Sequence, residues 1–164
     1  GSMNPYVTVE TMGTKTADWL EAIAPYNRHE MRLDAAASAL LVIDMQRFFL
    51  DPASPTYACG GIAVIPAVKR LIGAFRRAKR PVIFTRHVHH PGNLDAGIMG
   101  WWWEGMCLEG SEESEIHPEL APLAGEKTIL VLTKAAGDAL LKKDASLGAL
   151  KRYVLANGES VKGG

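Results

Sequence analysis

Three short apolar runs set the strongest limit on the fold of this chain. They read "ALLVID" (39–44), "PVIFT" (81–85) and "KTILVLTK" (127–134). Each is too short and too uniformly apolar for an amphipathic helix, which favours β-strands instead. Strands of this kind are typical of a parallel sheet that is covered on both faces. The three runs therefore predict parallel strands in an α/β fold.

Helical patterns separate and follow these strands. The segment "IPAVKRLIGAFRRAKR" carries an apolar stripe, which predicts a helix over about 62–78 with Pro66 in its first turn and cations in its last. The stripe consists of Ile65, Val68, Leu71, Ile72 and Phe75. A second helix is predicted over 139–157, where Asn157-Gly158 provides a stop. This alternation predicts βαβ units with right-handed crossovers.

The N-terminal region precedes the first predicted strand. Residues 1–3, Gly-Ser-Met, read as a cleavage scar before a start methionine, and we leave them out of the fold. The segment "TKTADWLEAIA" (14–24) places Trp19, Leu20 and Ile23 at helical spacing, which predicts a short helix lying on the body. We expect a single domain over 4–164 with a helical extension over about 4–37.

Charge balance and cysteine count narrow the possible partners. Lys plus Arg and Asp plus Glu are both 18, and this balance gives no support to a nucleic-acid partner. No apolar stretch approaches the roughly 20 residues that a spanning helix needs, so no membrane partner is expected. Cys59 and Cys107 fit neither a disulfide framework nor a zinc site, a pattern typical of a reduced, cytoplasmic protein.

Polar residues follow each predicted strand. Asp44 and Gln46 follow the first, Arg86 and His87 follow the second, and Lys134 ends the third. Ligands of open parallel sheets bind outside the carboxyl ends of the strands, so these residues are candidates for a site. An aspartate and a lysine at neighbouring strand ends can form a partly buried pair that positions a proton. The alternative is that these residues only mark where the chain leaves the core.

Histidines and tryptophans crowd the segment after the second strand. The histidines at 87, 89 and 90 lack an H-E-x-x-H pattern, so we expect a pocket edge or a hydrogen-bonded loop and no metal or other cofactor. Three consecutive tryptophans, 101–103, cannot all face a core from one helix or strand. At least one should line a pocket or an interface; the alternative is simple packing of a long insertion.

These motifs together resemble one known family. The segments "ALLVIDMQRFFLDP", "PVIFTRHVHHPGNLDAGIMGWW" and "EGSEESEIHPELAP", with a strand ending in Lys134, are similar to the isochorismatase-like hydrolases, or cysteine hydrolases. The resemblance implies a Rossmann-like three-layer α/β/α fold with a parallel sheet. It also implies hydrolysis of an amide or vinyl-ether bond in a small molecule. Asp44 would be the acid/base and Lys134 its partner, beside a cysteine nucleophile in the amidases. The candidate substrate-binding residues are Gln46, Phe49, Arg86, His87, Trp101 and Trp102.

The chain departs from the family pattern after Lys134. In the family a further strand leads into a "G-x-x-T-x-x-C-V"-like turn that carries the cysteine, and no counterpart occurs up to Gly164. We therefore expect C-terminal strands to be missing and a sheet of order 3-2-1 whose first strand has an open edge. Such an edge invites pairing, so a homo-oligomer is expected. A hydrolase, an inactive binding or assembly module, and a piece of a longer enzyme remain the alternatives.

Overall fold

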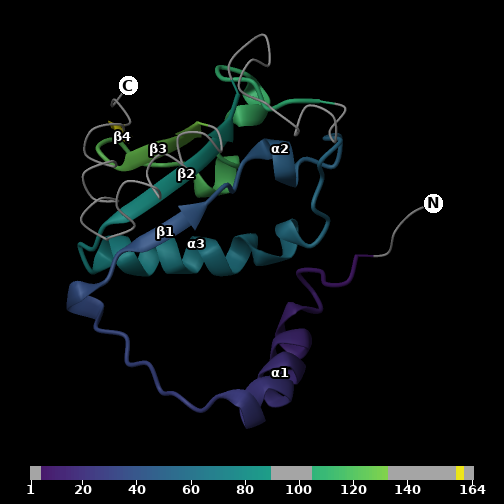
Figure 1. The fold of residues 1–164 in the computed structure, drawn as a ribbon, viewed down its shortest axis with the longest axis vertical. Helices are drawn as coiled ribbons and strands as arrows, with labels where there is room; N and C mark the ends of the chain where they lie inside the picture. Colours follow the sequence, from purple (N-terminus) through teal and green to yellow (C-terminus); the bar gives the residue numbers. More distant parts are fainter. Residues whose placement is uncertain (1–4, 90–104, 133–157, 161–164) are drawn as a thin grey trace, which may run out of the picture.

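The computed structural model describes residues 5–89, 105–132 and 158–160 (Figure 1). Its helices are α1 (Met12–Ile23), α2 (Arg47–Leu50) and α3 (Gly61–Arg77). Its strands are β1 (Leu40–Ile43), β2 (Val82–Val88), β3 (Lys127–Leu132) and β4 (Gly158–Ser160). Short 3-10 helices are η1 (Ala24–Tyr26), η2 (Ala35–Ala37), η3 (Glu112–Ser114) and η4 (Pro118–Leu120). The predicted helix over 139–157, Trp101, Trp102 and Lys134 lie outside the described residues.

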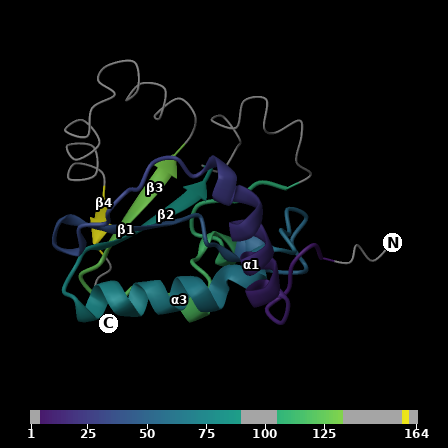
Figure 2. The same ribbon diagram turned by 90° about the horizontal axis from the view of Figure 1, so that it is seen from below.

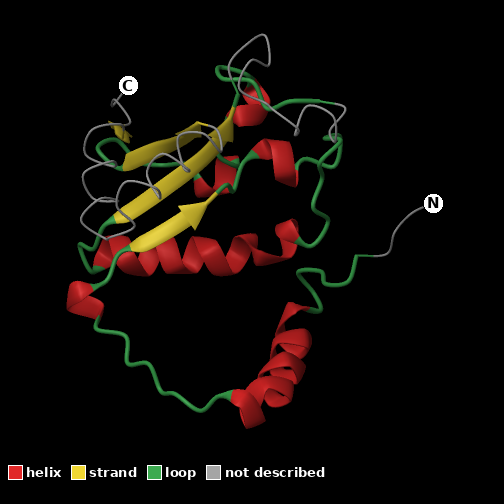
Figure 3. Cartoon of the chain, viewed as in Figure 1, coloured by secondary structure: helices red, strands yellow, loops and turns green. Residues whose placement is uncertain are grey.

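The described strands form one sheet in the order β1-β2-β3-β4 (Figure 3). β1, β2 and β3 are parallel, and the register pairs Ile43 with Thr85 and Thr85 with Ile129. The expected parallel strands and their 3-2-1 order are confirmed. Because β2 lies between them, β1 and β3 are about 10 Å apart. The expectation that Asp44 and Lys134 follow neighbouring strands is therefore wrong.

β4 is a strand that the sequence did not predict. It pairs antiparallel with β3, and Lys127 lies opposite Ser160. Gly158 had been expected to stop a helix, yet it begins this strand. The segment Gly-Glu-Ser has little intrinsic strand preference, so its conformation depends on the edge of β3 that it meets. Among the described strands, β1 therefore has an outer edge without a partner, whereas the edge of β3 is covered.

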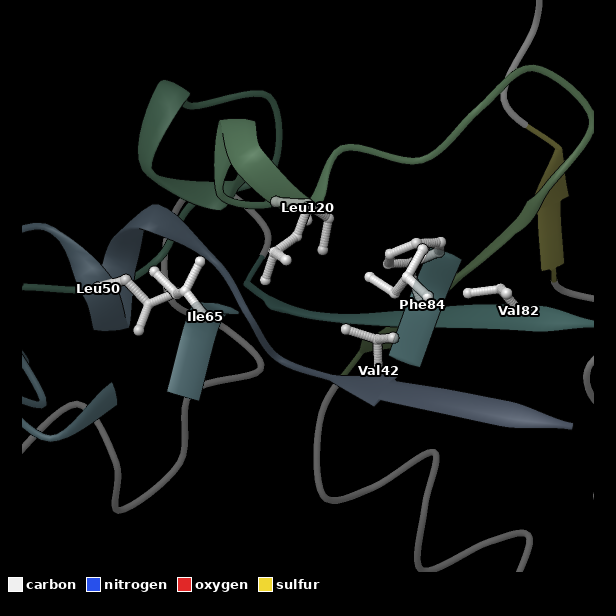
Figure 4. Close-up of a cluster of buried hydrophobic side chains, with 8 residues drawn as sticks. Val42, Leu50, Ile65, Val82, Phe84 and Leu120 are labelled. Atoms are coloured by element: carbon white, nitrogen blue, oxygen red, sulfur yellow. The ribbon is translucent and has the colours of Figure 1, made fainter. Parts of the chain in front are cut away.

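α3 packs beneath the sheet as a separate layer (Figure 2). Its buried side chains meet those of β1 and β2, and η4 closes the same core (Figure 4). This core consists of Val42, Leu50, Ile65, Ile72, Val82, Phe84, Ile116 and Leu120. Alternate residues of β1 and β2 supply it, as the two-residue period of a strand requires. The apolar stripe of α3 therefore fixes which face of the sheet becomes interior.

Two details of the predicted helix are wrong. α3 begins at Gly61, so Pro66 lies inside the helix and not in its first turn. Leu71 was placed in the stripe but is 49% exposed, since adjacent residues of a helix are turned by about 100° and Ile72 takes the buried position.

The N-terminal helix does not lie on the body as expected. α1 has no buried residue, and Leu20 and Ile23 are 59% and 53% exposed. Figure 1 shows it apart from the sheet, at the end of a long connection. Within the extension, Trp19 stacks on Tyr6 and donates a hydrogen bond to its hydroxyl over 3.1 Å. The helical spacing of apolar residues correctly predicted a helix. It could not predict whether another part of the protein would cover the apolar side of that helix.

Candidate active site

Asp44 stands at the carboxyl end of β1 in an unusual backbone conformation. Its φ is 51°, in the left-handed region that aspartate and asparagine tolerate better than most residues. The Asp44 N–H donates to the carbonyl of Thr85 over 3.2 Å and to the Thr85 hydroxyl over 3.1 Å. The same hydroxyl donates to Asp44 Oδ1 over 2.7 Å. The carboxylate is therefore held against β2.

β2 continues past the apolar run and carries His87 inside the strand. The strand was expected to end at Thr85 but extends to Val88. His87 Nε2 lies 2.8 Å from Nε2 of His89, because residues two apart share a face of a strand. The ring centroid of His87 is 6.4 Å from that of Phe49 on α2. The structure thus brings His87 and Phe49 together near the end of the sheet.

Arg86 lies on the other side of β2. Successive side chains of a strand point to opposite faces, so Arg86 points away from the side of Thr85 and His87. Its guanidinium contacts the carboxylate of Glu115 over 3.3 Å. Its buried Nε has no hydrogen-bond partner within the part of the chain that is described. This placement separates Arg86 from Asp44, although both follow apolar runs in the sequence.

Gln46 is an interior connector. Its side chain is 0% exposed. Its Nε2 donates to the carbonyls of His87 and Ser114, both over 2.9 Å, and contacts Cys107 Sγ at 3.6 Å. Its Oε1 accepts a hydrogen bond from the His87 N–H over 2.7 Å. Because these bonds use both ends of the amide, Gln46 ties β2 to η3 inside the protein.

Gln46→Leu is expected to destabilise the protein by about 2–4 kcal/mol. Leucine fills a similar volume but removes the amide that bonds the His87 N–H and the carbonyls of His87 and Ser114 in the interior. Urea unfolding monitored by circular dichroism measures the change. Arg47→Gln, which removes the largely exposed contact with Glu112, is the control and should cost less than about 1 kcal/mol. Equal losses for the two variants would contradict the connector role.

Cys107 is a buried thiol beside this connector. It is fully buried, whereas Cys59 is half-buried, and both are free. Burial, with a smaller contribution from the charge of Glu113, raises the pKa of Cys107 to about 11. A thiol with a raised pKa is a poor nucleophile, because the thiolate is the reactive form. Cys107 therefore fits a structural role.

Cys59 is expected to react with iodoacetamide about ten times faster than Cys107 at pH 8. The raised pKa keeps Cys107 protonated there, and its burial hinders the reagent. Mass spectrometry of peptides after timed labelling gives the two rates. The labelling of Cys107 should accelerate only as the pH approaches 11 or as the protein unfolds. Equal rates at pH 8 in the folded protein would show that Cys107 is accessible and ionised.

A pocket of about 240 Å³ lies next to α2. It is lined by Arg47, Leu50, Asp51, Pro52, Ile62, His117 and Pro118. Arg47, Leu50 and Asp51 share one side of a helical turn, and Asp44 does not contribute to the lining. The pocket is therefore separate from the contacts of Asp44.

Neither a metal-binding cluster nor a membrane-spanning helix occurs among the described residues. They contain no group of three or more His, Cys, Asp or Glu side chains arranged to hold a metal ion. Within the same residues, no helix is long and apolar enough to cross a membrane. The predicted site residues Trp101, Trp102 and Lys134 cannot be placed, because they lie outside the described part of the chain.

Thr85 contacts the candidate residue Asp44, Ser114 contacts Gln46, and the sequence revealed neither contact. Thr85 is 7% exposed and Ser114 is fully buried. A threonine in an apolar run looks like an ordinary strand residue. Only the register that pairs Ile43 with Thr85 places its hydroxyl beside Asp44. The polarity of Thr85 at the end of "PVIFT" was the single available signal.

Comparisons with known proteins place this architecture in a family. The model of the isochorismatase domain matches residues 38–147, which is most of the chain, and the chain belongs to the isochorismatase family. Nicotinamidase 3 of Arabidopsis thaliana is 36% identical over 96 residues. That match covers 58% of this chain and 44% of the relative, so the chain spans less than half of the curated relative it matches.

Solved structures show the same fold. An isochorismatase family protein from Desulfovibrio vulgaris is 26% identical, with a TM-score of 0.52 over 64% of this chain and 60% of that one. A cysteine hydrolase from Pseudomonas syringae pv. phaseolicola is 23% identical, with a TM-score of 0.58 over 63% of this chain and 50% of that one. The expected fold class, an isochorismatase-like α/β/α fold with a parallel sheet, is confirmed.

Proposed function

We propose that this chain carries the acid/base half of a hydrolase site that acts on an amide or vinyl-ether bond of a small molecule. The observation that carries the proposal is the carboxylate of Asp44, held at the carboxyl end of β1 by Thr85. Parallel α/β sheets build their sites at this edge. The nicotinamidase relative, an amidase by its name, supports an amide as the first substrate class to test.

In the proposed reaction Asp44 moves a proton. With a vinyl ether, the protonated carboxyl group gives its proton to the vinyl carbon, water adds to the resulting cation, and the hemiketal collapses to a carbonyl compound and an alcohol. With an amide, the Asp44 carboxylate takes the proton from an attacking nucleophile as the bond to the carbonyl carbon forms. The resulting carboxyl group returns that proton to the nitrogen as the C–N bond breaks. Lys134, which follows β3 in the sequence, is proposed to balance the charge of the carboxylate.

The proposed substrate contacts come from the residues near the end of β2. His87 and Phe49 are retained, since their rings lie on the Asp44 end of the sheet and near each other. Trp101 and Trp102 are proposed as an aromatic wall. Gln46 and Arg86 are proposed to hold the site together instead, because Gln46 is buried and Arg86 contacts Glu115.

Release of ammonia from nicotinamide and of pyruvate from isochorismate tests the proposed function. The two assays separate the amide route from the vinyl-ether route, because the second needs only a proton donor and water. Turnover of either substrate above a heat-denatured control supports the proposal. Absence of turnover on both, with the folded state verified by circular dichroism, would favour a non-catalytic role.

A binding or assembly module is the second candidate function. The environment of Cys107 favours this alternative, because burial raises the pKa of this thiol to about 11 and so disfavours the reactive thiolate. Calorimetry would support this alternative if the protein bound nicotinamide and released no ammonia from it.

The proposed setting is a cytoplasmic homo-oligomer. Its free cysteines fit a reducing compartment. The outer edge of β1 has no partner among the described strands, and Leu41 and Ile43 are exposed beside it. We propose that this edge pairs with a second copy, and that residues 4–164 form one domain with an extension over 4–37. A monodisperse monomer in multi-angle light scattering would count against the pairing.

A further inference from the structure

Thr85 makes two different hydrogen bonds to one residue through a single hydroxyl group. The oxygen accepts the Asp44 N–H over 3.1 Å, and the proton goes to Asp44 Oδ1 over 2.7 Å. The Thr85 carbonyl also accepts from the Asp44 N–H over 3.2 Å. These contacts hold the backbone and the side chain of Asp44 at the same time.

We propose that Thr85 is a positioning residue that fixes Asp44 for proton transfer and leaves Oδ2 as its reactive oxygen. This inference rests on the proposed function of Asp44. Left-handed backbone is unfavourable for a residue with a side chain, so it persists where neighbouring contacts hold it. The contacts from Thr85 are of this kind, because they close a ring between the N–H and the carboxylate of Asp44.

The hydrogen count assigns the reactive oxygen. A threonine hydroxyl has one proton to donate, and Thr85 gives it to Oδ1. Within the described residues, no donor reaches Oδ2. A proton that binds or leaves at Oδ2 does not break the contact, since Oδ1 accepts from the hydroxyl whether the carboxyl group is ionised or neutral. The clamp, meaning the contacts of Thr85 with the N–H and Oδ1 of Asp44, therefore persists whether the Asp44 carboxyl group is ionised or protonated.

A purely structural role for Thr85 makes a different prediction. If the residue only filled a strand position, valine would serve equally well, because it has nearly the same shape and a high strand preference. Serine would serve less well, since it lacks the methyl group. If Thr85 positions Asp44, the order is reversed, and serine preserves function while valine does not.

The test compares Thr85→Val with Thr85→Ser in the full chain, using whichever of nicotinamide or isochorismate the wild-type protein turns over. We expect Thr85→Val to lower kcat by about 10- to 100-fold with KM changed less than about threefold, since misplacement of a catalytic group acts on the chemical step. Thr85→Ser should retain kcat within about threefold of wild type. Wild-type kcat in Thr85→Val, or equal losses in both variants, would overturn the proposal.

A second measurement needs no turnover. In the ¹⁵N-labelled protein, the amide proton of Asp44 should exchange with solvent at least about tenfold faster in Thr85→Val than in Thr85→Ser or wild type. An unchanged rate would show that the Thr85 carbonyl alone holds this N–H, and it would overturn the role proposed for the hydroxyl. If the wild-type protein turns over neither substrate while the exchange rates differ as expected, the proposed function fails but Thr85 still positions Asp44. The two failures are thereby distinguished.

Discussion

Asp44→Asn is expected to lower the rate of hydrolysis by about 10²- to 10⁴-fold, because this is what proton transfer by a positioned group contributes to catalysis. Asparagine has the same shape, tolerates the left-handed backbone and presents an oxygen that accepts from Thr85. The substitution therefore removes the ionisable oxygen while the local contacts stay. Steady-state assays of ammonia or pyruvate release, with melting temperatures of both proteins, measure the effect.

The matched control for this substitution is Asp18→Asn. Asp18 is an exposed aspartate in α1, outside the contacts of Asp44. It should retain wild-type rates, so a loss there would point to a general effect of lost charge. Wild-type turnover in Asp44→Asn would contradict the acid/base role, whereas a large fall in its melting temperature would indicate that the fold had changed.

Phe84→Ala is expected to reduce the free energy of unfolding by about 3–5 kcal/mol. Phe84 is 0% exposed and lies between β1, α3 and η4, where Val42 and Leu120 contact the same cluster (Figure 4). Truncation leaves a cavity that close-packed neighbours fill only in part. Because natural domains are stable by about 5–15 kcal/mol, this loss is a large fraction of the total. Urea titration at equilibrium measures it.

Leu123→Ala is the control for the core substitution. Leu123 is 53% exposed in the segment before β3, so its truncation should change stability by less than about 1 kcal/mol. Similar losses for Phe84→Ala and Leu123→Ala would mean that the cluster around Phe84 is not the main core of the protein.

Local pattern was enough to predict most of the sheet. Each short apolar run became a strand, as is typical of parallel sheets, although Leu41 and Ile43 on one face of β1 are exposed. The stripe of α3 also gave the covered face. The helix begins before the stripe, at Gly61, which puts Pro66 inside it, and Leu71 is exposed beside the buried Ile72. β4 and the exposed surface of α1 could not be predicted in the same way. Both depend on what lies beside a segment, which its own residues do not encode.

The candidate site was predictable only at its strand ends. Asp44 was found because it follows an apolar run, at the edge where open parallel sheets bind their ligands. The roles of Gln46 and Thr85 depend on contacts between residues 41 positions apart in the sequence. Such contacts follow from strand register, and register follows from the packing of the whole sheet. Residue type alone therefore suggested that Gln46 contacts a substrate. The structure shows that its side chain is buried and hydrogen-bonded to His87 and Ser114.

The hydrogen bonds of the buried Gln46 also have a consequence for the order in which the protein folds. Gln46 reaches residues that are 41, 61 and 68 positions away, so its bonds close long loops of chain. Closing such loops costs entropy before any contact is gained, and contacts of this range are typical of slow, late folding steps. The surroundings of Asp44 should thus be absent from any early collapsed state. In refolding experiments, function is expected to return together with the last structural phase and not before it.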